Sequence, residues 1–416
     1  NSEPELISQS HLLVASYLQR YDRSADVEAR ILEEFEAAKR VAPNFAQAHV
    51  SAGVYWLEKV VGARNGGDLD DDAKEKALEK AATHFSKAIE IDEMNQTPTA
   101  APHYGLAEVA LQRDDAETAT AQWSEGLLLD PKPRPEVTDK LVRLLTLLEE
   151  LDEAESQLGE LATSLTALAG RPGVNEAAVI QACKLVGLLE GELYVARSEF
   201  QKAIQSLQPL FDQSLPDDSS GYTHRVALSL ARALMGLSMF ELAEPCLERA
   251  MGERPDDPLS NLLASELQKR LGSPDRAIEY LQKVADSEGR AIDWLRLARE
   301  VLTVESMKED VEPSYKRVEL ALDEAEQRLA DEEDDSIADP WEIDFLRINM
   351  ARLRFIQNAG DEEVNRSELR DGLLLQFVAT EEKYPEELEL KKRLYNIYDL
   401  LEQPSEQTRV YEWMNQ

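Results

Sequence analysis

Small and large apolar residues recur along this chain at spacings of three and four, with polar residues between them. The pattern is clearest over residues 225–289, where it is written twice at a distance of 34 residues. Side chains at such spacings lie on one stripe of an α-helix, which can pack against a neighbouring helix. The stretch therefore predicts two successive helical hairpins, whose matching positions are Leu230, Ala231, Ala243, Leu247 and Ala250, then Ala264, Ser265, Ala277, Leu281 and Val284.

The second helix of each hairpin has a pattern of its own. A small residue is followed four positions later by a large apolar one, then three positions later by another small one, and finally by proline. Proline ends a helix because it lacks the backbone donor and crowds the preceding turn. Matches of varying quality occur elsewhere at Ile31, Phe35 and Ala38; Ala81, Phe85 and Ala88; Ala119, Trp123 and Gly126; Ala154, Leu158 and Leu161; Ala196, Phe200 and Ala203, with Pro209; Val318, Leu322 and Ala325; and Leu373, Phe377 and Thr380.

This period, carried by two successive helices, resembles the tetratricopeptide repeat family. The resemblance covers roughly residues 5–416. It implies an all-α fold, an α-solenoid that winds as a right-handed superhelix of about nine to ten hairpins, several of them irregular. We expect an N-terminal array over 1–215 and a C-terminal array over 222–416 that continues it. Lengthened helices or extra loops are expected where units exceed the regular length, as around the link from Arg64 to Asp72.

The balance of charge bears on the partner. With 82 acidic and 45 basic residues, the chain has a net charge of −37. That charge argues against nucleic acid or an anionic membrane as the main ligand, since both would be repelled. It favours basic partners or serves to keep a long array in solution. Direct membrane insertion is not expected, because no apolar run approaches about 18 residues. We expect a soluble, cytoplasmic region, although a targeting segment could precede Asn1, which is not a methionine.

Residues that would support catalysis or a cofactor are not arranged for either. The five histidines lack partners at metal-ligand spacing, and no phosphate-binding or nucleophile motif is present. Asp68 and Asp70 begin like a calcium loop, but the glycine and glutamate that should follow are missing. Cys183 and Cys246 lie in apolar helical context and are expected to be buried thiols. The chain is therefore interpreted as non-enzymatic, with no metal or cofactor.

The resemblance also implies a binding groove, because the first helices of such repeats line the concave face. By register these positions include Tyr104, Glu108, Arg225, Leu228, Arg232, Met235, Leu262, Glu266 and Lys269, with Arg296 and Arg299 in the next first helix. Arginine, methionine and leucine on one face suit a peptide with an acidic group and an apolar anchor. The alternative is that the arginines pair with neighbouring carboxylates and hold the array together. The family's lysine–asparagine clamp for a terminal carboxylate is not matched, since Asn261 is one register off.

Three functional hypotheses follow. The first is a protein-interaction scaffold that binds a peptide or protein segment in its concave groove. The second is a regulatory or substrate-docking region of a larger enzyme, because such arrays are often fused to catalytic domains. The third is a self-assembling repeat protein that associates through its C-terminal end, where Val410, Tyr411, Trp413 and Met414 give residues 405–414 an unusual apolar content.

Overall fold

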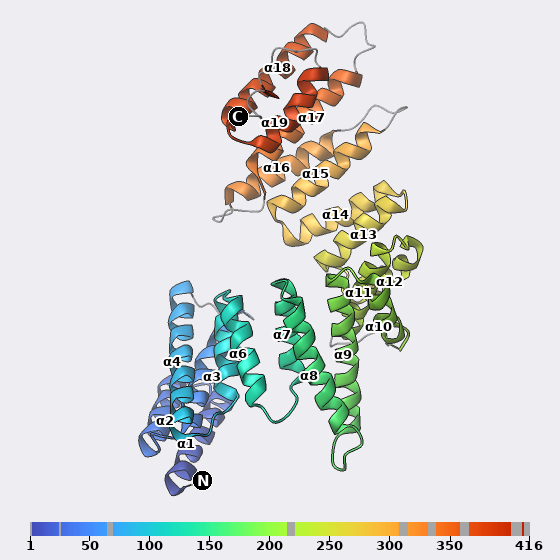
Figure 1. Cartoon of the computed structure of the whole chain (residues 1–416). Coiled ribbons are helices and arrows are strands. Elements are labelled where there is room, and N and C mark those ends of the chain that lie inside the picture. Colours follow the sequence, from blue (N-terminus) through green and yellow to red (C-terminus); the bar gives the residue numbers. More distant parts are fainter. Residues whose placement is uncertain are drawn as a thin grey trace. The chain divides into compact units, whose positions relative to one another are not determined.

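A computed structural model describes residues 2–24, 26–64, 70–213, 221–307, 315–331, 338–357, 366–400 and 410–411. Each helix in this part of the chain packs chiefly on its neighbours in sequence, and no strand occurs in it (Figure 1). The contacts divide the chain into two compact units, Asn1–Asp212 and Gln213–Gln416. The all-α repeat fold expected from the sequence is confirmed.

Unit 1 is built from ten helices in five successive hairpins, within the residues just given. Their bounds are α1 Glu3–Tyr21, α2 Val27–Val41, α3 Ala46–Arg64, α4 Asp71–Asn95, α5 Ala101–Gln112, α6 Ala116–Leu129, α7 Pro135–Leu147, α8 Leu151–Leu168, α9 Glu176–Ala196 and α10 Phe200–Gln213. The expectation of lengthened helices holds here, since α4 alone has 25 residues.

Unit 2 continues the same arrangement with four hairpins and one further helix, again within the described residues. Their bounds are α11 Tyr222–Gly236, α12 Phe240–Glu253, α13 Pro258–Arg270, α14 Pro274–Glu288, α15 Ala291–Ser306, α16 Lys316–Asp331, α17 Pro340–Gln357, α18 Arg366–Lys383 and α19 Leu388–Leu400. The two hairpins that define the sequence period are α11 with α12 and α13 with α14.

The residues that the second-helix pattern selects form one part of the core, beside buried residues of the first helices. The large member of eight of the nine matches is buried between helices, and the small members beside it let the neighbouring helix approach closely. The buried large residues are Phe35, Phe85, Trp123, Leu158, Leu247, Leu281, Leu322 and Phe377. The pattern was therefore right in register at these eight places.

The match at residues 196–203 was wrong in register. Ala196 is exposed at the end of α9, and Phe200 begins α10 instead of filling its centre. Ala203 and Leu207, seven residues further along, are fully buried and occupy the small and large positions. A shift of seven keeps the same helix face, so the sequence pattern could not distinguish the two registers. Pro209 lies inside α10 and does not end it.

One buried ring shows how closely the helices approach. The side chain of Phe85, from α4, lies against Gly53 of α3 and Gly105 of α5. A Cβ atom at position 105 would lie 2.4 Å from two ring carbons, and one at position 53 would lie 2.7 Å from the nearest. Only glycine leaves room for this ring at either position.

The C-terminal end of unit 2 is better packed than its sequence suggested. Tyr398 of α19 is fully buried, with its ring centre 5.8 Å from that of Phe377. Val410 is fully buried in the same cluster, whereas Tyr411 is exposed. The predicted self-association surface over 405–414 otherwise falls outside the described residues.

Candidate protein-binding site

A cavity of about 260 Å³ opens in unit 2 between α13 and α15, which are the first helices of consecutive hairpins, and one residue of α14 also lines it. Three cationic and two acidic side chains line it, together with two leucines and one serine. The lining residues are Leu262, Ser265, Glu266 and Lys269 of α13, Leu281 of α14, and Arg296, Arg299 and Glu300 of α15. We call this cavity the α13–α15 channel.

Helix geometry explains why these side chains share one surface. Leu262, Glu266 and Lys269 are separated by four and three residues, so they follow one another along one face of α13. The N-terminus of that helix is capped, because the carboxylate of Asp257 accepts a hydrogen bond of 2.7 Å from the backbone N–H of Ser260. The opposite face of α13 packs into the core through Ala264 and Leu267.

Ion pairs connect the walls of the channel. The ammonium of Lys269 lies 2.7 Å from a carboxylate oxygen of Glu300 and so joins α13 to α15. One guanidinium nitrogen of Arg299 lies 3.0 Å from both carboxylate oxygens of Glu342 and joins α15 to α17. These ion pairs agree with the alternative left open by the sequence, in which the basic residues pair with neighbouring carboxylates and hold the helices together. They also leave the cations partly exposed at the channel surface.

Asp293, in the first turn of α15, is the anchor for Arg296. Its carboxylate is completely buried and lies 2.9 Å from Arg296 and 2.8 Å from Arg290. A negative charge is favourable at a helix N-terminus, and two guanidinium groups compensate for its loss of hydration. The direction of Arg296 at the channel edge is thereby fixed.

Ser265 is the unusual residue of the channel. It is 1% exposed, and its hydroxyl has no hydrogen-bond partner among the described residues. A buried hydroxyl without a partner costs free energy, roughly 1–3 kcal/mol. The residue lines the channel, so its buried hydroxyl is a candidate hydrogen-bond donor to a group that enters there.

The other predicted groove residues lie on different helices. On α11, Arg225 and Met235 are half-buried, Leu228 is buried and Arg232 is exposed. None of these four lines the α13–α15 channel.

On α5 of unit 1, Tyr104 lies against Gly126, and burial chiefly raises the pKa of its phenol to about 12. Glu108, four residues later on the same helix, forms an ion pair with Lys140 of α7. The structure thus gathers Leu262, Glu266 and Lys269 with Arg296 and Arg299, and it places the rest of the predicted groove elsewhere.

Three lining residues were not predicted as groove residues. Ser265 and Leu281 were recognised only as packing positions of the repeat, which they also are. Glu300 follows Arg296 by four residues, so helical spacing could have identified it. The lack of a hydrogen-bond partner for Ser265 could not be predicted from the sequence, because it depends on which polar groups lie beyond hydrogen-bond distance in the folded chain.

Asn261, which lies one register off the family's clamp position, has a structural role. Its side-chain nitrogen donates hydrogen bonds to the carbonyl oxygens of Pro255 and Asp257, at 2.8 and 2.9 Å. The residue is buried and fastens the turn before α13. It is not presented to an incoming carboxylate.

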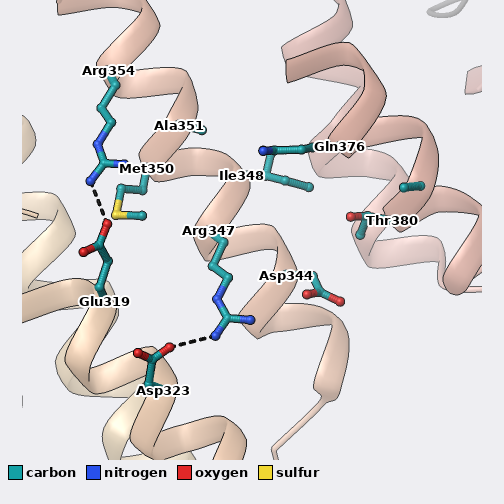
Figure 2. Close-up of a pocket in the computed structure, with 11 residues that line it drawn as sticks. Glu319, Asp323, Asp344, Arg347, Ile348, Met350, Ala351, Arg354, Gln376 and Thr380 are labelled. Atoms are coloured by element: carbon teal, nitrogen blue, oxygen red, sulfur yellow. Dashed lines mark hydrogen bonds and ion pairs between the residues drawn. The ribbon is translucent and has the colours of Figure 1, made fainter. Parts of the chain in front are cut away.

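A second pocket, of about 470 Å³, lies over α17 between α16 and α18 (Figure 2). Figure 2 shows Arg354 directed toward Glu319 and Arg347 toward Asp323, at 2.8 and 2.9 Å. On the other side of the pocket, residues of α18 donate hydrogen bonds to the carboxylate of Asp344. The groove predicted from the sequence ended at Arg299 of α15 and therefore did not reach this pocket, which is lined mainly by α17.

The charges of this second pocket are satisfied within the protein. Arg347 also lies 2.6 Å from Glu326, and these ion pairs raise its pKa against the opposing effect of burial. Asp344 accepts hydrogen bonds from Lys383 at 2.8 Å and from the Tyr384 hydroxyl at 3.0 Å. We interpret this set as a network that joins α16, α17 and α18.

Within the described ranges, no group of three or more histidine, cysteine, aspartate or glutamate residues is placed to hold a metal ion. No described helix is long and apolar enough to cross a membrane. Cys246 is buried as expected, but Cys183 is exposed. The expectation for Cys183 was wrong because the core side of α9 is formed by Ala182, Val186 and Leu189.

No protein-family model and no curated protein matches this chain. Among solved structures, one of Pseudomonas aeruginosa pilF is 17% identical, has a TM-score of 0.39 and covers 57% of this chain and 92% of its own. A tetratricopeptide repeat protein of Parabacteroides merdae is 16% identical, with a TM-score of 0.44 and coverage of 71% and 97%. The APC/C complex Cut9–Hcn1 is 15% identical, with a TM-score of 0.44 and coverage of 71% and 54%. Similarity at this level carries no argument about partner or activity.

Proposed function

We propose that the protein is a non-enzymatic interaction scaffold that binds a segment of another protein in the α13–α15 channel. The observation that carries the proposal is the buried, unpartnered hydroxyl of Ser265 inside a cavity lined by cations. A bound group that accepts a hydrogen bond from this hydroxyl would remove its desolvation cost. The protein alone leaves that cost in place.

The chemistry of the channel favours a segment with an acidic residue beside an apolar one. Lys269, Arg296 and Arg299 offer positive charge to a carboxylate, and Leu262 offers apolar surface. The net charge of −37 would keep a strongly acidic protein away at long range. The segment should therefore combine one or two acidic residues with a partner surface that is basic or neutral.

Selection from a random peptide library displayed on phage tests the proposal. Peptides retained by the parent protein should share an acidic residue near a large apolar one. Ser265→Ala should bind them about five- to tenfold more weakly, as expected for loss of one hydrogen bond. The same change should leave stability unaltered or raise it, since the hydroxyl has no partner to lose.

A matched pair of charge changes separates this site from general electrostatics. Lys269→Glu alters the channel, whereas Arg276→Glu makes the same change of charge on an exposed position of α14. Binding should weaken with the first, because a carboxylate at position 269 repels the acidic residue of the peptide, and it should be kept with the second. Equal effects of the two variants, or full binding by Ser265→Ala, would move the binding surface away from this channel.

A further inference from the structure

The N-terminal helix α1 carries an apolar face that no described part of the chain covers. Six large apolar side chains on it are exposed, more than on any other described helix. They are Leu6, Ile7, Leu13, Val14, Tyr17 and Tyr21. The opposite face of α1 is already used, because Ala15 and Leu18 are buried against α2 and α3. The exposed face is therefore additional to what the fold requires.

The spacing of this face is that of a helix–helix seam. Positions 3, 6, 10, 13, 17 and 20 alternate by three and four residues, as in a coiled coil. The centre of the seam is apolar, with Leu6 54% exposed, Leu13 72% and Tyr17 63%. The rings of Tyr17 and Tyr21 lie 5.0 Å apart on the same side. Tyrosine is well suited to interfaces, because it combines apolar area with a hydroxyl that tolerates water.

The two ends of the seam carry opposite charges. Glu3 stands at the first position and Arg20 at the last, and both are exposed. If a second α1 lies antiparallel on the first, Glu3 of each copy faces Arg20 of the other. The same register places Leu6 against Tyr17 and Ser10 against Leu13. The seam is thus self-complementary in charge, as a two-fold interface must be.

The net charge restricts where two copies can meet. Each chain has a net charge of −37, so contact through most surfaces would place acidic residues of the two copies against each other. Residues 2–24 carry little net charge, with three acidic and two basic side chains. A second copy therefore meets little repulsion at this segment.

We propose that α1 is a self-association surface on which α1 of a second copy packs antiparallel. A single helix pair is small for a protein interface, so the dimer is reversible and depends on concentration. This surface differs from the α13–α15 channel and from the predicted C-terminal association surface. It would allow one assembly to present two channels.

Sedimentation equilibrium of the 416-residue chain tests the proposal. The weight-average mass should rise from 46.8 kDa toward twice that value as the protein concentration increases from about 1 to about 200 µM. Leu13→Glu should raise the dissociation constant about tenfold or more. Leu128→Glu, at an equally exposed position of α6, should leave it unchanged. A parent that remains at 46.8 kDa throughout, or equal effects of the two variants, would overturn the proposal.

Charge reversal tests the antiparallel register. Glu3→Arg and Arg20→Glu should each weaken association, because like charges then face each other. The double variant should recover the parent mass, since the pairs are restored in reverse. Failure to recover would exclude this register. If the parent stays monomeric but floats with neutral phosphatidylcholine vesicles, the face belongs to a lipid surface and self-association is refuted.

Discussion

Replacing Gly105 with alanine should destabilise unit 1, although alanine is normally the better residue in a helix. The new Cβ atom would lie 2.4, 2.4 and 2.6 Å from three ring carbons of Phe85. Real Cβ atoms essentially never approach so closely, so the ring must move. The ring has little room to move, because it is fully buried and also packs closely against the backbone at Gly53.

Two opposing effects set the magnitude. Overpacking a closely packed core costs about 1–3 kcal/mol, and the close contact with three ring atoms places this case at the upper end. The change from glycine to alanine within a helix contributes about 1 kcal/mol in the other direction. The net loss of stability for Gly105→Ala should therefore be about 2 kcal/mol.

Urea unfolding followed by tryptophan fluorescence measures this loss, with Trp56 and Trp123 reporting on unit 1. Gly62→Ala is the matched control, since a Cβ atom there meets nothing within 4 Å. That variant should gain up to about 1 kcal/mol. Adding Phe85→Leu to Gly105→Ala should cost less than the sum of the two single changes, because the smaller side chain relieves the clash. If Gly105→Ala stabilises the protein as much as Gly62→Ala does, the reasoning is refuted.

Two further changes test the core and its pH dependence. Trp123→Ala should cost about 3–5 kcal/mol, because the side chain is 1% exposed; a melting curve like that of the parent would contradict this. Acid should weaken the contact between α3 and α4, where the Nδ1 atoms of His49 and His84 lie 3.4 Å apart. Burial is the main cause that lowers the pKa of both histidines below 6.5, and the charge of Lys39 is the next. The pKa of His84 falls to about 4, although Glu36 opposes the shift in both residues. The folded state thus binds fewer protons, so stability should fall as pH drops from 6.5, by about 1 kcal/mol near pH 5.5 after allowance for solvent. His84→Gln should flatten this dependence in urea titrations at several pH values, and an unchanged slope would exclude the pair as its source.

The periodic core could be predicted from the sequence because its rule is local. Phe85, Trp123 and Leu281 were identified by spacing alone, and each is buried as expected. The register at Ala196 could not be determined in this way, because α9 has 21 residues and the pattern repeats after two turns. Local spacing specifies a helix face but not the length of the helix that carries it.

The site was less predictable because it depends on neighbours that are distant in sequence. Helix register identified Lys269 and Arg299 as surface positions, but not Glu300 and Glu342 as the carboxylates that pair with them. The face of α1 was overlooked for a related reason. Leu6 and Leu13 could not be assigned to the core or to the surface, since nothing in the sequence indicates which of two apolar faces a helix buries.

The ion pairs of the channel bear on how a partner would be recognised. The ion pair of Lys269 with Glu300 is only partly exposed, and a partner carboxylate that displaces Glu300 exchanges this pair for a similar one. Charge alone then adds little affinity, and the gain must come from the Ser265 hydroxyl and from apolar contact with Leu262. Binding should consequently depend more on Ser265 than on salt concentration. Affinity that collapses with salt but survives Ser265→Ala would instead indicate a diffuse electrostatic surface.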